Sequence, residues 1–121
     1  MHHVLIVDDQ PGIRLLLEEI MKIEGFQVTT AINGKDALEK IEARAPDLML
    51  VDYKLPVIDG LTLVKQLESE GTVIPTIIMT GMPEKISDEV KTLKSVQTIF
   101  SKPFNINDAR STIKAFFLQN K

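Results

Sequence analysis

Five polar residues of this chain could do chemistry together if the fold gathers them in one place. Each of the five lies directly after an apolar run or one residue beyond it, and they are Asp8, Asp9, Asp52, Thr80 and Lys102. Three carboxylates in one place raise one another's pKa values unless cations balance their charge. Lys102 supplies one positive charge, and a hard divalent cation such as Mg²⁺ binds oxygen ligands of this kind. A carboxylate nucleophile, a metal, a hydroxyl donor and a lysine together indicate phosphoryl transfer.

The elements that must position these residues are short apolar runs that alternate with helical patterns. The runs are continuous, which is typical of strands covered on both faces, as in a parallel sheet. The expected strands are residues 4–7, 26–32, 47–51, 75–79 and 96–101, of which the second and fifth are weaker. The carboxyl ends of such strands form one edge of the sheet, where α/β proteins bind ligands. We therefore expect the five polar residues to meet at that edge.

Apolar residues recur at helical spacing between the expected strands. The first pattern begins at Pro11, runs from Ile13 to Ile23 and ends at Gly25. Further helices are expected around residues 37–41, 61–67, 86–93 and 113–117, and the fourth of the five helices is shorter and more polar. Five strands alternating with five helices predict an α/β doubly wound sheet with right-handed crossovers.

Composition excludes several classes of protein. The 121 residues include no cysteine, which rules out disulfides, thiolate zinc sites and thiol catalysis. The net charge is −3 and there is no basic run, so no nucleic-acid partner is expected. The apolar runs are far shorter than the roughly 20 residues that cross a bilayer, and the N-terminus is no signal peptide. We expect a cytoplasmic protein without a membrane partner, with His2 and His3 in a solvated tail.

The polar residues and their neighbours make the chain resemble the receiver domain of two-component response regulators. The motifs that carry the resemblance are Asp8-Asp9, Asp52, Pro56 with Asp59-Gly60, Thr80-Gly81 and Lys102-Pro103-Phe104, in this order along essentially the whole chain. The resemblance implies a flavodoxin-like five-stranded parallel sheet of order 2-1-3-4-5 with five helices. Because the chain ends soon after the fifth expected helix, we expect a single receiver domain over residues 1–121 and no output domain.

The resemblance also implies a role for each polar residue. Asp52 is the implied phosphoacceptor, and Thr80 and Lys102 are implied to bind phosphoryl oxygens. The implied ligands of Mg²⁺ or Mn²⁺ are Asp8, Asp9, Asp52 and the backbone carbonyl of Lys54, with Asp8 acting through a coordinated water. The implied activity is a Mg²⁺-dependent phosphotransfer from a partner's phosphohistidine to Asp52, with slow self-dephosphorylation.

Two stretches, residues 7–20 and 99–108, resemble the stand-alone receivers of sporulation phosphorelays. Such receivers take phosphate from a sensor histidine kinase and pass it to a histidine phosphotransferase, and a phosphatase is a further candidate partner. Lys54, two residues after Asp52, is expected to crowd the attacking water and slow the loss of phosphate. The expected partner surface around Asp52 consists of Gln10, Pro11, Gly12, Ile13, Leu16, Pro103 and Phe104.

Other interpretations stay open beside this one. Asp8 and Asp9 could be acids favoured at a helix N-terminus, and Ile13 and Leu16 could belong to the core. The alternative role is a chemotaxis-like receiver that binds a partner when phosphorylated. The chain could also be an interaction module without phosphate, a cofactor binder or a phosphatase, although no Gly-rich loop follows the first strand. Ile99 stands where many receivers carry a switch aromatic, so no rotating aromatic signal is expected.

Overall fold

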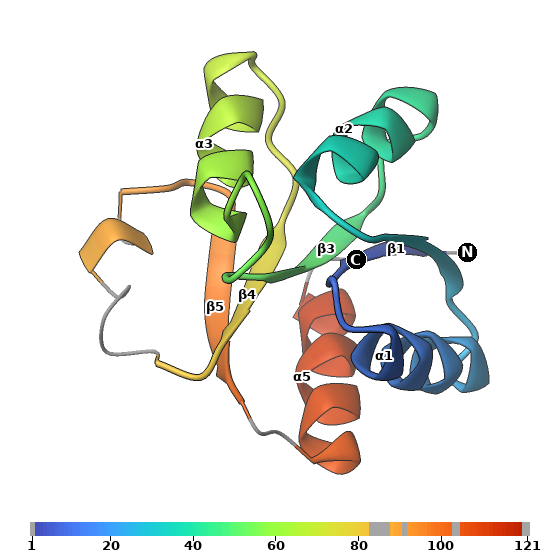
Figure 1. Cartoon of the computed structure of the whole chain (residues 1–121). Helices are drawn as coiled ribbons and strands as arrows, with labels where there is room; N and C mark the ends of the chain where they lie inside the picture. Colours follow the sequence, from blue (N-terminus) through green and yellow to red (C-terminus); the bar gives the residue numbers. More distant parts are fainter. Residues whose placement is uncertain (1, 83–87, 91, 103–104, 120–121) are drawn as a thin grey trace.

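Five parallel strands form one sheet in the order β2-β1-β3-β4-β5 (Figure 1). The computed structural model describes residues 2–82, 88–90, 92–102 and 105–119. The strands are β1 (His3–Val7), β2 (Gln27–Ala31), β3 (Leu48–Asp52), β4 (Thr76–Thr80) and β5 (Val96–Ser101). The predicted class and strand order are confirmed, and β1 lies between β2 and β3 as the doubly wound topology requires.

Helices connect the strands and begin at recognisable signals. They are α1 (Pro11–Ile23), α2 (Gly34–Ala43), α3 (Gly60–Ser69) and α5 (Ile106–Gln119). The side chain of Asn33 caps α2 and that of Asp59 caps α3, because each accepts a hydrogen bond from a backbone N–H three residues later. Residues 88–90 are helical at the place of the expected fourth helix, which otherwise falls partly outside the described residues. Within the described part of the chain, none of the helices has the length and apolarity needed to cross a bilayer.

The helices form two layers, with α1 and α5 on one face of the sheet and α2 and α3 on the other (Figure 1). Because successive side chains of a strand point to opposite faces, each strand contributes to two cores. Val7 and Val51 pack on the α2–α3 side, while Ile6 and Leu50 pack on the α1–α5 side. Two covered faces explain why the apolar runs of the central strands are continuous.

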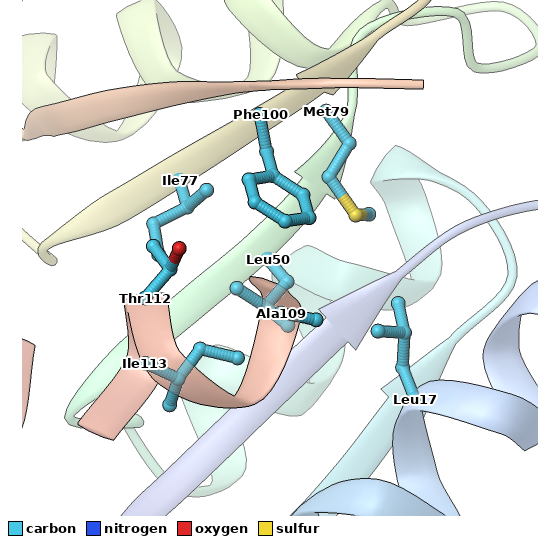
Figure 2. A pocket seen from close by; sticks show the side chains of 8 residues that line it. All are labelled: Leu17, Leu50, Ile77, Met79, Phe100, Ala109, Thr112 and Ile113. Atoms are coloured by element: carbon cyan, nitrogen blue, oxygen red, sulfur yellow. The ribbon is translucent and has the colours of Figure 1, made fainter. Parts of the chain in front are cut away.

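A small apolar cavity of about 10 Å³ lies between the sheet and α5 (Figure 2). Phe100 of β5 and Met79 of β4 point into it, opposite Ala109 of α5 (Figure 2). This volume is at the lower limit for one water molecule, and an apolar lining offers water few partners, so we interpret it as a packing gap. Ile99, the residue at the switch-aromatic position, is half-buried against the core on the other face of the sheet.

The expectation of a solvated tail is wrong for His3, whereas His2 is exposed as expected but is not free of contacts. The ring of His2 stacks on Phe117, with ring centroids 4.2 Å apart. His3 begins β1 and is only 4% exposed, and its Nε2 lies 2.6 Å from the Thr29 hydroxyl oxygen. Its backbone N–H donates to the Asp47 carboxylate. The amino end of the sheet therefore contains a buried imidazole.

The buried imidazole should make stability depend on pH. Burial, together with the charge of Arg44, lowers the pKa of His3 below its ordinary value of 6.5. Between the folded pKa and 6.5 the unfolded chain then binds more protons than the folded one, so stability falls as pH drops below 6.5. We expect urea unfolding at pH 7.5 and 5.5 to show a smaller loss of stability in His3→Gln than in the wild type. His2→Gln is the control, and equal losses in wild type and His3→Gln would refute the expectation.

Val57 has a left-handed backbone in the loop between β3 and α3. Its φ is +67°, and the N–H of Ile58 donates to the carbonyl of Pro56 around it. A β-branched residue is strained in this conformation, and the fully exposed Val57 side chain gains nothing from burial. We expect Val57→Gly to raise the free energy of unfolding by about 1 kcal/mol. In urea unfolding, the exposed Val73, whose φ is not positive, should give the opposite result when replaced by glycine.

Candidate functional site

The carboxyl ends of four strands deliver polar side chains to one edge of the sheet. Asp52 and Thr80 are the last residues of β3 and β4, and Asp8 and Lys102 directly follow β1 and β5. Pairing of Asp52 with Met79 and of Thr80 with Ser101 keeps these strand ends in register. Parallel strands therefore bring residues from the two ends of the chain to the same edge.

Three carboxylates meet at this edge. One oxygen each from Asp8, Asp9 and Asp52 lies within 4.8 Å of the other two. Asp8 is fully buried, Asp52 is 5% exposed, and Asp9 is open to solvent. Buried carboxylates at such spacing need a balancing cation, and the oxygen donor set fits Mg²⁺ or Mn²⁺. The arrangement is an acidic pocket typical of Mg²⁺ binding.

Lys102 partly balances the buried acids. Its Nζ lies 3.3 Å from Asp8 Oδ2 and 3.3 Å from Asp52 Oδ2. Its backbone N–H donates to the carbonyl of Thr80, which holds the residue beside β4. Burial, followed by the charge of Asp8, raises the pKa of Asp52 above its ordinary value, although Lys102 opposes the shift. The ammonium of Lys102 therefore offsets only part of the cost of ionising Asp52. A bound cation would further favour the ionised form of Asp52.

Backbone bonds hold the segment after β1 in place. Asp8 Oδ1 accepts a hydrogen bond from the N–H of Gln10, and the N–H of Asp8 donates to the carbonyl of Ala31. Arg14 Nη1 donates to the carbonyl of Asp8 at 2.8 Å. Helical periodicity alone puts Arg14 on the polar face of α1 and gives it no role. The only signal in the sequence was a cation one turn into the helix that follows two acids.

Gly60 brings α3 against the end of β3. A Cβ atom at Gly60 would lie 2.6 Å from the carbonyl oxygen of Asp52 and 3.0 Å from Cα of Tyr53. The N–H of Gly60 also donates to the carbonyl of Tyr53. Asp59-Gly60 forms the turn and the helix start that such a pair predicts, but the close approach of Gly60 to Asp52 is not apparent from the sequence. A glycine at the first position of a helix, where it is less usual than after the last, was the available signal.

Asp9 and Asp52 line an open cavity beside Gln10. Its lining consists of Asp9, Gln10, Asp52, Lys54, Leu55, Pro56, Gly81 and Lys102. The N–H of Lys54 donates to Asp52 Oδ1 at 3.3 Å, a local turn bond at the start of the β3–α3 loop. The Thr80 hydroxyl accepts a hydrogen bond from the N–H of Met82 and is not part of the lining. Most of the lining residues are polar, and Leu55 and Pro56 are its apolar side chains.

The expected partner surface is only partly described. Gln10, Pro11, Gly12 and Leu16 are exposed, and Ile13 is half-buried against the core between the sheet and α1. Gln10 connects this surface to the cavity. Pro103 and Phe104 lie outside the described residues.

Comparison with known proteins gives one family. The model of the response regulator receiver domain matches residues 4–114. Sporulation initiation phosphotransferase F of Bacillus subtilis is 41% identical over 114 residues, covering 93% of this chain and 91% of that protein. The alkaline phosphatase synthesis transcriptional regulatory protein PhoP of the same organism is 30% identical, covering 98% of this chain but 49% of that protein.

Solved structures agree with the fold. Chemotaxis protein CheY4 of Vibrio cholerae superposes with a TM-score of 0.86 at 29% identity, covering 95% of this chain and 98% of that one. Response regulator TrrA of Thermotoga maritima, solved in complex with Mg²⁺ and BeF, gives a TM-score of 0.83 at 30% identity with the same coverage.

Proposed function

Because this chain belongs to the family of response regulator receiver domains, we propose that it accepts a phosphoryl group on Asp52 and passes it onward in a phosphorelay. The observation that carries the proposal is the position of Asp52 at the end of β3, within 4.8 Å of two further carboxylates and beside Lys102. An interaction module that never meets phosphate would not need charges gathered and buried in this way.

The proposed reaction uses the carboxylate of Asp52 as nucleophile. One Asp52 oxygen attacks the phosphorus of a partner's phosphohistidine, a P–O bond forms, and the P–N bond to the imidazole breaks. The imidazole leaves with the electron pair of that bond and takes a proton, and the product is an acyl phosphate on Asp52. Lys102, whose Nζ lies 3.3 Å from Asp52, would balance charge on the phosphoryl oxygens, and the hydroxyl of Thr80 would donate to one of them.

The site residues fit a divalent cation. Asp8, Asp9, Asp52 and the backbone carbonyl of Lys54 are the proposed ligands of Mg²⁺ or Mn²⁺, with Asp8 acting through a water. When bound, the cation supplies charge neutralisation for the transferring phosphoryl group. The chain's own contribution is to hold the acids in place while Leu55 and Pro56 limit access of water from one side.

A relay role is favoured over an alternative, chemotaxis-like role. The support is the 41% identity to a sporulation phosphotransferase over nearly the full length of both chains. In this proposal a sensor histidine kinase donates the phosphoryl group and a histidine phosphotransferase accepts it. A phosphatase removes the phosphate from Asp52, and all of these reactions take place in the cytoplasm. The likeness to a chemotaxis protein supports the second candidate, a receiver that acts by phosphorylation-dependent binding.

The proposed docking surface for these partners begins at the edge of the cavity. Gln10 lines the cavity, and the exposed Pro11, Gly12 and Leu16 continue from it along α1. A partner that brings a histidine to Asp52 must contact this surface at the start of α1. Ile13, half-buried beneath it, would form the apolar floor of the contact.

The decisive experiment is incubation with acetyl phosphate and Mg²⁺, followed by intact-mass analysis. We expect the wild type to gain the mass of one phosphoryl group and Asp52→Asn to gain none. Asp59→Asn is the matched control. Asp59 lies in the loop that follows Asp52 and caps α3, and asparagine caps a helix as well as aspartate does. An adduct that persists in Asp52→Asn, or a wild type that never forms one, would overturn the proposal.

Lys54 is expected to prolong the life of the phosphate on Asp52. Its exposed side chain leaves the loop at the cavity, where it can crowd a water approaching the phosphorus. Lys54→Asn should therefore lose phosphate several-fold faster than the wild type once acetyl phosphate is removed. Lys94→Asn, an exposed change before β5, should leave the rate unchanged. An unchanged or slower loss in Lys54→Asn contradicts the hypothesis.

A further inference from the structure

Arg14 donates a hydrogen bond to the backbone of Asp8 in the acid cluster, but it is not itself one of the acids. We propose that Arg14 is a positioning residue of the metal site: its guanidinium holds the peptide between Asp8 and Asp9 so that both carboxylates face Asp52. This inference rests on the proposed function, because it concerns the cation that the acids would share. The bond that carries it is the 2.8 Å contact from Arg14 Nη1 to the carbonyl oxygen of Asp8.

The two neighbouring acids can meet only where the backbone leaves the extended conformation of β1. In an extended strand, successive side chains point to opposite sides, so consecutive carboxylates would diverge. Here Asp8 is fully buried and Asp9 is exposed, yet their oxygens lie within 4.8 Å of each other and of Asp52. The direction of both side chains therefore depends on how the peptide between them is rotated. The carbonyl that Arg14 binds belongs to that peptide.

Other bonds of the segment fix its two ends. The N–H of Asp8 is tied to β2 through Ala31, and the N–H of Gln10 is tied to Asp8 Oδ1. On the helix side, the N–H of Arg14 donates to the carbonyl of Gln10 as α1 begins. The side chain of Arg14 then reaches back from that first turn to the remaining peptide. A guanidinium suits this task because its donors are planar and it keeps its charge at every physiological pH.

A purely electrostatic role for Arg14 predicts the opposite effect. Arg14 carries a positive charge next to an anionic pocket, so its removal should make the pocket more attractive to a divalent cation. If Arg14 instead positions the acids, its removal lets the Asp8–Asp9 peptide rotate and separates the ligands. Mg²⁺ affinity then falls, as it does when a partner that orients a metal ligand is lost. The sign of the change in affinity distinguishes the two roles.

The test is calorimetric titration of the unphosphorylated full chain with Mg²⁺ alone, for the wild type, Arg14→Met, Arg14→Lys and Arg44→Met. We expect the dissociation constant of Arg14→Met to be about tenfold larger than that of the wild type. Arg14→Lys, which keeps the charge and one donor group, should lie between the two. Arg44→Met removes an exposed arginine at the other end of the sheet and should change little. Circular dichroism of each variant establishes that the folded protein is titrated.

Each outcome has a distinct meaning. A larger dissociation constant for Arg14→Met with partial rescue in Arg14→Lys supports positioning. An equal or smaller constant for Arg14→Met overturns this inference while the proposed function stands. If Arg14→Met does not fold, the comparison uses folded Arg14→Lys. A Mg²⁺ dissociation constant equal to that of the wild type then overturns the inference, and a larger dissociation constant supports it. Failure of the wild type to bind Mg²⁺ overturns both the inference and the proposed metal site.

Discussion

Replacing Gly60 by alanine is expected to destabilise the protein by about 3 kcal/mol and to impair phosphorylation of Asp52. The added Cβ would lie 2.6 Å from the carbonyl oxygen of Asp52 and 3.1 Å from Cγ1 of Val51. The first of these is a backbone atom of the central strand, so it cannot turn aside as a flexible side chain would. Either α3 moves away from β3 or the end of β3 is displaced together with Asp52, the proposed phosphoacceptor.

The measurement is urea unfolding combined with labelling by acetyl phosphate. Gly12→Ala is the matched control, because a Cβ at Gly12 meets no heavy atom within 4 Å and α1 gains a better helix former. It should be as stable as the wild type or more stable. Equal stabilities of Gly60→Ala and Gly12→Ala would show that the close approach of α3 to β3 carries no energetic weight.

Lys102→Met is expected to lower stability by about 3 kcal/mol in the absence of divalent cations. The substitution leaves the fully buried Asp8 and the nearly buried Asp52 facing each other without the ammonium that lies 3.3 Å from both. Adding Mg²⁺ should restore more stability to Lys102→Met than to the wild type, because the cation then replaces the missing charge. Urea unfolding with EDTA or Mg²⁺ measures both effects.

A double substitution isolates the charge effect. In Lys102→Met with Asp8→Asn, one uncompensated carboxylate is removed, and much of the lost stability should return. Lys65→Met is the control for removing a lysine, because Lys65 and Glu89 form an exposed pair whose loss should be close to neutral. If Lys102→Met behaves like Lys65→Met, the buried acids are not balanced by Lys102.

The strands were predictable because of where they lie in the sheet. The central strands β1, β3 and β4 are buried along their whole length and gave unbroken apolar runs. The edge strands β2 and β5 are partly exposed, which explains why their signals were weaker. Asp52 and Thr80 were expected just after their strands but are the last residues of them. An apolar run stops at the first polar residue, whereas the backbone pairing that defines a strand continues through it.

The site was predictable in type but not in detail. A polar residue at or directly after the end of four of the five strands identifies the edge where ligands bind, so Asp8, Asp52 and Lys102 could be named from the sequence. The role of Arg14 depends on the direction of its side chain, which reaches back to the carbonyl of Asp8. Helical periodicity predicts only that Arg14 lies on the polar face of α1, not this direction. His3 was misjudged because a polar residue at a strand start looks like a chain terminus. Its burial depends on contacts with Thr29 and Asp47, far away in sequence.

Tyr53 gives the protein a natural optical reporter. It is the only tyrosine in a chain without tryptophan, and it directly follows Asp52. Its N–H donates to Met79 and its carbonyl accepts from Gly60, so its backbone is fixed to both β4 and α3. Burial, followed by the charges of Asp59 and Glu89, raises the pKa of its phenol, which stays protonated at neutral pH. Tyrosine emission therefore comes from one fluorophore next to Asp52, the proposed phosphoacceptor, so the proposed cation binding and phosphorylation can be tested without an added dye.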